Sequence, residues 1–154
     1  MEHEEIIQRA KNFLATQRIA SLATAKDNYP WIVDLFYVAD ESYNLYFLIS
    51  KNSKTWSNIE ENKNVAVTID AHASDASRQK NIQVKGTAQT LSKEELESVI
   101  DSFEVAFPDL VDENDSVSDF KGKDSEDRFI KITPENIFFR DSEAFEGRHE
   151  IVLS

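Results

Sequence analysis

Hydroxyl and ammonium groups crowd one short stretch of the chain, Ser50–Thr55, which reads SKNSKT. The residues after it carry apolar side chains three apart, so we expect a short helix over Ser53–Asn62 with Ser53 as its N-cap. A helix N-terminus presents free N–H groups and partial positive charge, and Lys51 and Lys54 add two cations. The stretch therefore predicts a phosphate-binding site, although the same residues also suit an ordinary capped helix with two solvated lysines.

A single carboxylate interrupts the most apolar segment of the chain. Trp31–Val38 reads WIVDLFYV, and its two alternating faces are apolar except for Asp34. A carboxylate in such a strand needs hydrogen-bond donors if it is buried. Asp34 could accept from a ligand N–H, or from a backbone or side-chain donor of the protein itself.

Two polar segments contain residue types that bind metals, but neither has the spacing of a known metal-binding motif. His72 lies between Asp70 and Asp75, but this arrangement matches no strong ligand motif. The acidic segment Asp109–Asp127 lacks the regular spacing and the glycine of a calcium loop. We expect solvated loops at both places, and no metal.

The composition is that of one globular domain spanning residues 1–154. Apolar residues make up 40% and charged residues 30% of the 154 residues, which is enough for a sizeable core. The sequence contains no cysteine, so disulfides, thiolate metal sites and a cysteine nucleophile are excluded.

The net charge of −12 argues against nucleic acid and anionic membranes as partners, because both need a basic surface. No apolar run approaches the length of a membrane span, and the acidic N-terminus does not resemble a signal peptide. We expect a soluble, cytoplasmic protein. A local basic pocket for a small phosphorylated ligand stays compatible with the overall charge.

Periodicity predicts three helices and about six to seven strands. The helices are Glu2–Thr16, Ser53–Asn62 and Ser92–Phe107, the last opening with the capping box of Ser92 and Glu95. The expected strands are Arg18–Ala25, Trp31–Val38, Asn44–Ile49, Val65–Ile69, Asn81–Thr90, Arg128–Ile132 and Ile137–Arg140.

The connections favour a mainly β (α+β) fold. Short turns join the early strands, which predicts antiparallel pairing and a closed or nearly closed barrel with helices outside. Gly86 lies inside its strand, which indicates a bulge or a close backbone approach. Thr133-Pro134-Glu135 is expected to separate the last two strands, and the apolar tail Phe145–Ser154 is expected to dock.

The order of these elements resembles the FMN-binding split barrels related to pyridoxamine 5′-phosphate oxidase. The resemblance covers roughly Ala20–Ser92 and lies in three strings, IASLATAKDNYPWIVDLFYVAD, LYFLISKNSKTWSNIEENKNVAVTID and IQVKGTAQTLS. The later strings FPDL and RFIKITPENIFF resemble a small branch of the same superfamily. The resemblance implies an antiparallel split barrel that binds FMN at a homodimer interface.

The resemblance also implies a set of cofactor-binding residues. The FMN phosphate would lie near the start of the short helix, and the flavin ring would lie along the second and third strands. The implied residues are Val33, Asp34, Leu35, Leu48, Ile49, Ser50, Ser53, Lys54, Thr55 and Gln83.

The sequence departs from the oxidase at several basic positions. Ile32 and Tyr37 stand where the oxidase has an arginine and a lysine, and Ser53-Lys54 stands for its Arg-Lys pair. We therefore do not expect pyridoxamine phosphate oxidase activity, but an FMN-dependent oxidoreductase acting on another small substrate.

The alternative is a non-enzymatic module that binds or senses a flavin, a deazaflavin or haem. His72 and His149 are the candidate axial ligands for haem. A hydrolase is not expected, because nothing resembles a nucleophile elbow.

Overall fold

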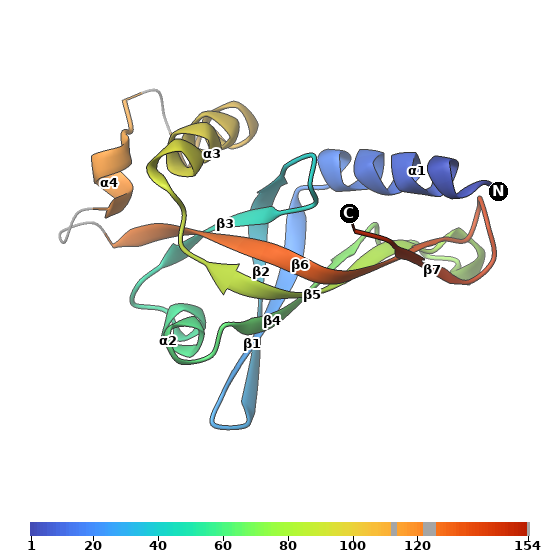
Figure 1. The fold of residues 1–154 in the computed structure, drawn as a ribbon, viewed down its shortest axis with the longest axis horizontal. Coiled ribbons are helices and arrows are strands. Elements are labelled where there is room, and N and C mark those ends of the chain that lie inside the picture. Colours follow the sequence, from blue (N-terminus) through green and yellow to red (C-terminus); the bar gives the residue numbers. More distant parts are fainter. Residues whose placement is uncertain (112–113, 122–125, 154) are drawn as a thin grey trace.

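The computed structural model describes residues 1–111, 114–121 and 126–153, and antiparallel strands dominate it (Figure 1). In chain order its elements are α1 (His3–Thr16), β1 (Ile19–Lys26), β2 (Tyr29–Ala39), β3 (Leu45–Ser50), α2 (Lys54–Glu61), β4 (Asn64–Asp70), a 3-10 turn (Ala76–Arg78), β5 (Lys80–Gln89), α3 (Lys93–Ala106), α4 (Val117–Lys121), β6 (Asp127–Asp141) and β7 (Arg148–Ile151).

Six of the strands close into a barrel. The order is β3-β2-β1-β4-β5-β6, and β6 pairs again with β3, while β7 adds to β6 outside the ring. Every pairing is antiparallel. The structure therefore confirms the predicted mainly β fold, an antiparallel split barrel with flanking helices.

Two apolar clusters hold the fold together. The larger one fills the barrel and includes fully buried side chains from β1, β3, β4, β5 and β6, namely Leu22, Phe47, Ile69, Ile82 and Phe139. The smaller one packs α3 and α4 against β3 and β6 through Phe103, Phe120 and Phe129. Figure 1 shows α3 and α4 together on one side of the barrel and α1 on the other.

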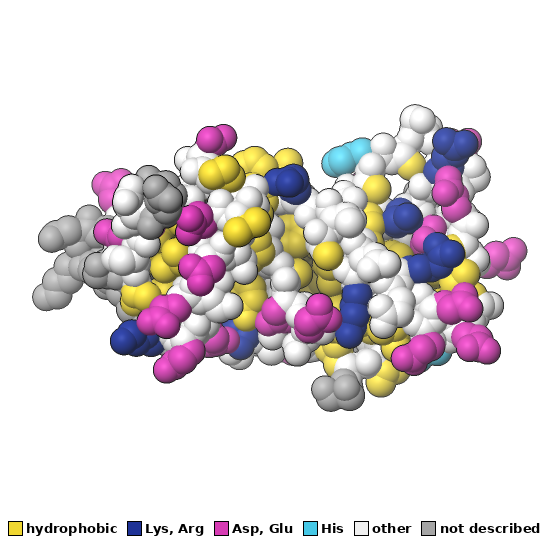
Figure 2. All heavy atoms as spheres, turned by 90° about the horizontal axis from the view of Figure 1, so that it is seen from above, with side chains coloured by type: hydrophobic (Ala, Val, Ile, Leu, Met, Phe, Trp, Pro, Cys, Tyr) yellow, Lys and Arg dark blue, Asp and Glu magenta, His cyan; other side chains and the backbone are white. Residues whose placement is uncertain are grey.

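Each helix follows from local sequence. Ile6, Ala10, Phe13 and Leu14 form the buried stripe of α1. The predicted capping box of α3 is confirmed, with Glu95 N–H donating to Ser92 Oγ at 3.1 Å. Figure 2 shows acidic side chains spread over the face that carries α1 and α3, in keeping with the net charge of −12.

The expected separation of the last two strands is wrong. Arg128–Ile132 and Ile137–Arg140 belong to one strand, β6, in which Pro134 pairs with Gly86 and Glu135 is the extra residue of a bulge. A proline cannot donate to a ladder, and a bulge is where a sheet tolerates one. The irregularity lies between Lys85 and Gly86, which confirms the predicted bulge.

The described part of 109–127 is not a purely solvated loop. Val111 is buried, and Phe120 on α4 packs its ring 4.9 Å from the ring of Phe129. The expectation failed because two apolar side chains among many acids are enough to dock a short helix. The tail also docks, with Ile151 of β7 buried in the barrel cluster.

Replacing Gly86 with alanine should destabilise the barrel. An added Cβ would lie 2.6 Å from the carbonyl oxygen of Thr133, which is backbone and cannot move aside cheaply. We expect a loss of about 1–3 kcal/mol in the free energy of unfolding, measured by urea denaturation. Gln89→Ala, at an exposed position of the same strand, is the control, and equal stabilities of the two variants would contradict the close approach.

Candidate functional site

Strands β2 and β3 separate soon after they meet, and the opening between them is the candidate site. They pair only where Tyr37–Ala39 lies beside Leu45–Phe47. Among the described residues, Tyr29–Phe36 has no partner on β3, while Leu48–Ser50 pairs with β6 instead. The barrel is thus split along one edge of β2, and a cavity of about 400 Å³ opens there.

Strand geometry points backbone groups of β2 into this split. Tyr37 N–H donates to Arg18 O at 3.0 Å, so the backbone groups of Tyr37 face β1. Backbone groups of successive residues face opposite edges of an antiparallel strand, which turns those of Asp34 and Phe36 toward the split. Exposed backbone donors and acceptors at a cavity wall are suited to hydrogen bonds with a flat, polar ligand.

The cavity walls are mostly apolar, with carboxylates at the rim. Its lining comes from β1, β2, β3, α3, the loop after α3 and the start of β6, and includes Ile19, Asp34, Phe36, Leu48, Phe103 and Leu110. The rings of Phe36 and Phe107 lie 4.8 Å apart, and Arg18 lies 5.5 Å over the ring of Phe107. The end of α3 is therefore fixed against the open edge of β2.

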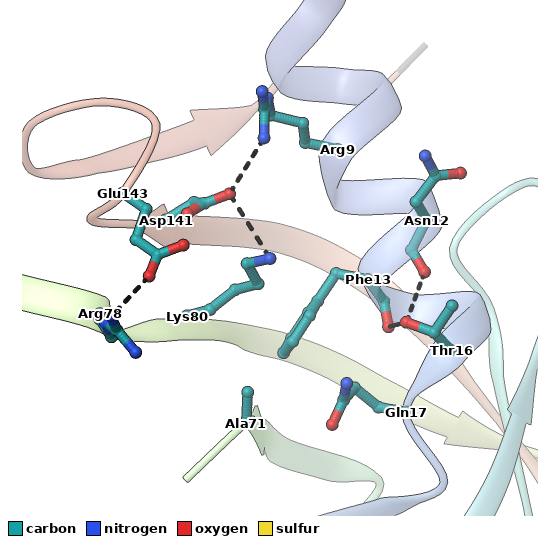
Figure 3. Close-up of a pocket in the computed structure, with 10 residues that line it drawn as sticks. All are labelled: Arg9, Asn12, Phe13, Thr16, Gln17, Ala71, Arg78, Lys80, Asp141 and Glu143. Atoms are coloured by element: carbon teal, nitrogen blue, oxygen red, sulfur yellow. Dashed lines mark hydrogen bonds and ion pairs between the residues drawn. The ribbon is translucent and has the colours of Figure 1, made fainter. Parts of the chain in front are cut away.

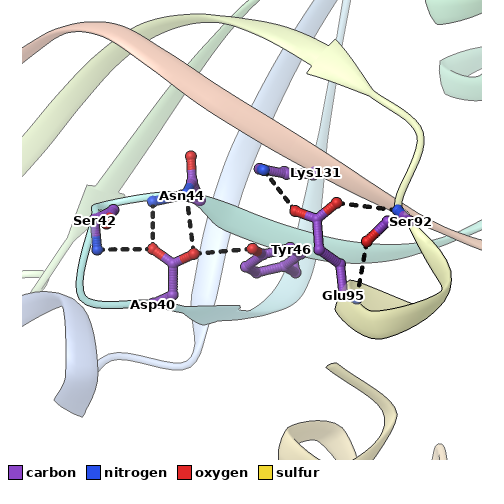
Figure 4. A network of polar contacts seen from close by, with 7 residues as sticks. All are labelled: Asp40, Ser42, Asn44, Tyr46, Ser92, Glu95 and Lys131. Carbon is purple, nitrogen blue, oxygen red and sulfur yellow. Dashed lines mark hydrogen bonds and ion pairs between the residues drawn. The ribbon is translucent and has the colours of Figure 1, made fainter. Parts of the chain in front are cut away.

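A polar network at the other end of α3 holds the helix on the barrel (Figure 4). Lys131 Nζ of β6 donates to Glu95 Oε2 at 2.5 Å, and the same carboxylate accepts from Ser92 N–H at 3.0 Å. Nearby, Tyr46 Oη donates to Asp40 Oδ2 at 2.9 Å, and burial raises the pKa of Tyr46. Since α3 carries Phe103, this network positions one wall of the cavity.

The start of α2 is built as predicted. Ser53 Oγ accepts from Trp56 N–H at 3.1 Å and donates to Ser50 O at 2.7 Å, which confirms Ser53 as the N-cap. Lys54 is exposed, and its Nζ lies 5.3 Å over the ring of Trp31 on β2. The ammonium group therefore stands between the helix N-terminus and the strand that borders the split.

The structure brings part of the predicted set together. Asp34, Leu35 and Leu48 line the split cavity, and Ser50, Ser53 and Lys54 lie at the β3–α2 junction. Four other side chains do not face the split: Val33 and Ile49 pack in or against the core, Thr55 is buried, and Gln83 lies on the outer face of β5.

Gln83 belongs to a second cavity on the outer face of the barrel. This cavity, of about 330 Å³, is lined by residues of β1, β2, β4, β5 and β6, among them Ser21, Ile32, Thr68, Gln83 and Phe138. A row of paired residues, Asp34, Ser21, Thr68 and Gln83, crosses four strands, so the split and Gln83 are three strand spacings apart. At about 4.8 Å per strand they are roughly 14 Å apart within one protomer.

Asp34 has an internal partner. Ser21 Oγ donates to Asp34 Oδ1 at 2.5 Å, and the side chain is exposed rather than buried. The protein thus supplies one donor to this carboxylate, and its other oxygen stays open to solvent or a ligand. Phe36, Phe103 and Leu110 were not singled out from the sequence, because apolar strand and helix positions are most often core.

The loop around His72 is polar and exposed. His72 Nδ1 lies 3.6 Å from Asp70 Oδ2, whereas Asp75 Oδ1 accepts from Ser77 N–H. Within residues 1–111, 114–121 and 126–153, no three His, Asp or Glu side chains gather as a metal site would require. A helix long and apolar enough to span a bilayer is likewise not found in those residues.

The sequence matches the model of the pyridoxamine 5′-phosphate oxidase family over residues 6–141. Because this match spans most of the chain, the protein belongs to that family. The resemblance stated from local strings is therefore confirmed. No curated protein matches the sequence.

Several solved structures share the fold. ChuZ from Campylobacter jejuni superposes with a TM-score of 0.75 at 16% identity, over 98% of this chain and 61% of that chain. HutZ, a haem storage protein from Vibrio cholerae, gives 0.69 at 20% identity, over 85% and 92%. An FAD-binding protein from Mesorhizobium loti gives 0.62 at 21% identity, over 84% and 88%. Such low identities establish a common fold and leave function to be argued from the site.

The Glu95–Lys131 contact should make stability depend on pH. The hydrogen bond from Lys131, and after it the one from the Ser92 N–H, lower the pKa of Glu95 below its ordinary value of 4.5. The contribution is therefore complete above that value and is lost as pH falls through the folded-state pKa. Glu95→Gln should be less stable than the natural protein at about pH 7, and the difference should shrink at about pH 3.

Urea unfolding at the two pH values measures this effect. Glu94→Gln, one residue earlier on α3, is the control and should show no such pH-dependent difference. A stability gap for Glu95→Gln that is constant with pH would show that the carboxylate does not contribute through its charge.

Proposed function

We propose that this protein is a flavoprotein that binds FMN in the split between β2 and β3, and that it is an oxidoreductase for a small substrate. Family membership supports a flavin, and the open edge of β2 beside a cavity of about 400 Å³ is the observation that carries the proposal. Asp34, Leu35 and Leu48 line that cavity, as the resemblance implied.

The start of α2 fits the phosphate of FMN. Its first two N–H groups, those of Lys54 and Thr55, have no carbonyl partner within the helix. Together with the helix dipole and the Lys54 ammonium they make an anion site of modest strength. Ser53 Oγ is engaged in capping, so it contributes through the geometry of the loop and not as a free donor.

The open edge of β2 fits the flavin ring. Backbone groups of Asp34 and Phe36 supply hydrogen bonds along the ring edge, and the Asp34 carboxylate can accept from a ring N–H. Phe103 and Leu110 exclude water from the same space. When bound, the flavin supplies the electron-transfer chemistry, and the chain needs to supply position and a dry environment.

A second copy of this chain completes the proposed site. Ile19, Ile32 and Phe36 are 51%, 63% and 43% exposed and lie on one outer face of β1 and β2. Large apolar side chains grouped on one face are typical of a protein interface. Within one protomer Gln83 is too far from the split to contact a flavin there. In a homodimer formed through this face, Gln83 of the partner can approach that flavin instead.

Haem is the second candidate ligand, and His72 is the observation that favours it. Its side chain is 89% exposed, and its Nδ1 lies 3.6 Å from Asp70 Oδ2. A carboxylate beside one ring nitrogen orients an imidazole so that the other nitrogen can bind iron. Haem storage by HutZ, which shares the fold, makes this alternative worth measuring.

An absorption spectrum tests the proposal directly. The purified protein is measured alone, and again after addition of FMN and removal of the excess by gel filtration. Retained flavin bands that shift on addition of a reductant are expected. Retention of haem instead of FMN, or of neither chromophore, would refute the flavoprotein proposal.

Lys54→Ala should weaken FMN binding at least several-fold, because loss of a charge-assisted hydrogen bond costs roughly 1.5–3 kcal/mol. Riboflavin, which lacks the phosphate, should bind both proteins equally. Isothermal titration calorimetry with both flavins measures the difference. Lys63→Ala, just beyond the other end of α2, is the matched control, and an effect of equal size there would place the phosphate elsewhere.

A further inference from the structure

Two arginines face each other on the outer surface of neighbouring strands. Arg140 on β6 and Arg148 on β7 are directly paired in the antiparallel register, so their side chains leave the sheet on the same face. Opposed cross-strand positions bring Cβ atoms to within about 5.5 Å, and like charges there are destabilising. Such a pair needs a compensating partner.

The partners that the structure shows are neutral. Arg148 donates from Nη1 to Gln83 Oε1 and from Nη2 to Asn81 Oδ1, both at 3.0 Å. Arg140 donates from Nη1 to Gln79 Oε1 at 3.2 Å. The three amides orient the two guanidinium groups but bring no negative charge.

One donor of the pair is left unsatisfied. Arg140 Nε is buried and has no hydrogen-bond partner. Leaving a buried donor unpaired is costly, and natural proteins do so rarely. An acceptor that reaches Nε and one Nη of the same guanidinium would satisfy this donor in a bidentate contact.

Two other arginines of the chain are paired with carboxylates. In the pocket beside α1, Arg9 lies 3.6 Å from Asp141 and Arg78 lies 3.4 Å from Glu143 (Figure 3). Among the described residues, no carboxylate comes within the 4.0 Å of an ion pair to Arg140 or Arg148. In a chain with 29 acidic and 17 basic residues, carboxylates to pair with are plentiful.

A purely structural role explains the contacts of Arg148 but not the position of Arg140. Arg148 reaches from β7 across β6 to β5, which ties the C-terminal strand to the barrel. This link between strands explains the amide contacts of Arg148, but a second cation directly opposite, Arg140, does not strengthen it. Glu150, the next outward-facing residue of β7, accepts from Asn136 Nδ2 at 3.1 Å and is held by that contact.

We propose that Arg140 and Arg148 form a binding site for the oxyanion group, phosphate or carboxylate, of a small molecule. Each guanidinium has five N–H donors in a planar fork, of which the amides use two on Arg148 and one on Arg140. The remaining donors suit bidentate contacts with two oxygens. Because the amides already hold the guanidinium groups in place, less side-chain entropy is lost when an anion binds. The anion removes the repulsion and satisfies Arg140 Nε.

The anion site adjoins the proposed flavin site in a homodimer, because Gln83, which accepts from Arg148, is also the residue proposed to approach the flavin of the partner. The two anion positions still differ, since this one lies on β5, β6 and β7 and the FMN phosphate is assigned to the start of α2. Loss of one anion site can therefore be measured without loss of the other.

Isothermal titration calorimetry of the purified protein tests the proposal, with inorganic phosphate and succinate as probes and ionic strength held constant with sodium chloride. Saturable binding of at least one probe is expected. Arg140→Gln and Arg148→Gln should each weaken it at least about tenfold, as expected for loss of charge-assisted bidentate contacts. Arg78→Gln, which removes an arginine already paired with Glu143, should leave it unchanged.

The variants keep the test interpretable. Arg140→Gln leaves the strand tie of Arg148 intact, so its effect on binding can be read even if Arg148→Gln loosens β7. Binding of phosphate alone would assign a phosphoryl ligand, and binding of both probes would support any oxyanion. Lys54→Ala should bind phosphate here as the natural protein does.

The proposal is overturned if neither probe binds saturably. It is also overturned if Arg140→Gln binds the probes as tightly as the natural protein. Loss of phosphate binding in Lys54→Ala with retention in Arg140→Gln would assign the anion to α2 and not to this site.

Discussion

The site and the walls around it depend on one pairing choice, the early separation of β3 from β2. Three residues of β3 pair with β2, and six pair with β6. Backbone groups that leave a ladder need other partners, so the open edge of β2 requires water or a ligand. The cover over this edge comes from α3, whose second apolar cluster and polar network on Lys131 fix its position. The split is therefore held open by the same contacts that close the rest of the barrel.

The fold up to α3 was predictable because its signals are local. Alternation marks the strands, Ser53 and Ser92 cap their helices, and Gly86 marks the bulge. The second half was harder because long-range contacts override local preference. Pro134 indicates a turn on its own, yet a bulge at the next residue, Glu135, allows β6 to continue past it. Val111 and Phe120 look isolated in an acidic segment until Phe129 is placed beside them.

The candidate site was predicted in part, and the limit is geometric. A period of two tells which side chains share a face, but not which face points inward. Val33 and Ile49 turned out to pack with the core, so only their backbone is available near the split. Asp34 lies on the other face and reaches both Ser21 and solvent. Gln83 shows a further limit, because long-range strand pairing places it three strands away from the split, and local patterns do not reveal that pairing.

One edge of β6 pairs with β5, and its other edge pairs with two different strands. Residues Asp127–Ile132 pair with β3, whereas Ile137–Arg140 pair with β7. The C-terminal half of this edge would otherwise present a row of unpaired backbone groups beside apolar side chains, which is a template for adding strands from other molecules. Strand β7 thus covers an edge at which strands of other chains could otherwise add. A four-residue strand is also short enough to offer little edge of its own, so the protection does not create a new place for chains to stack.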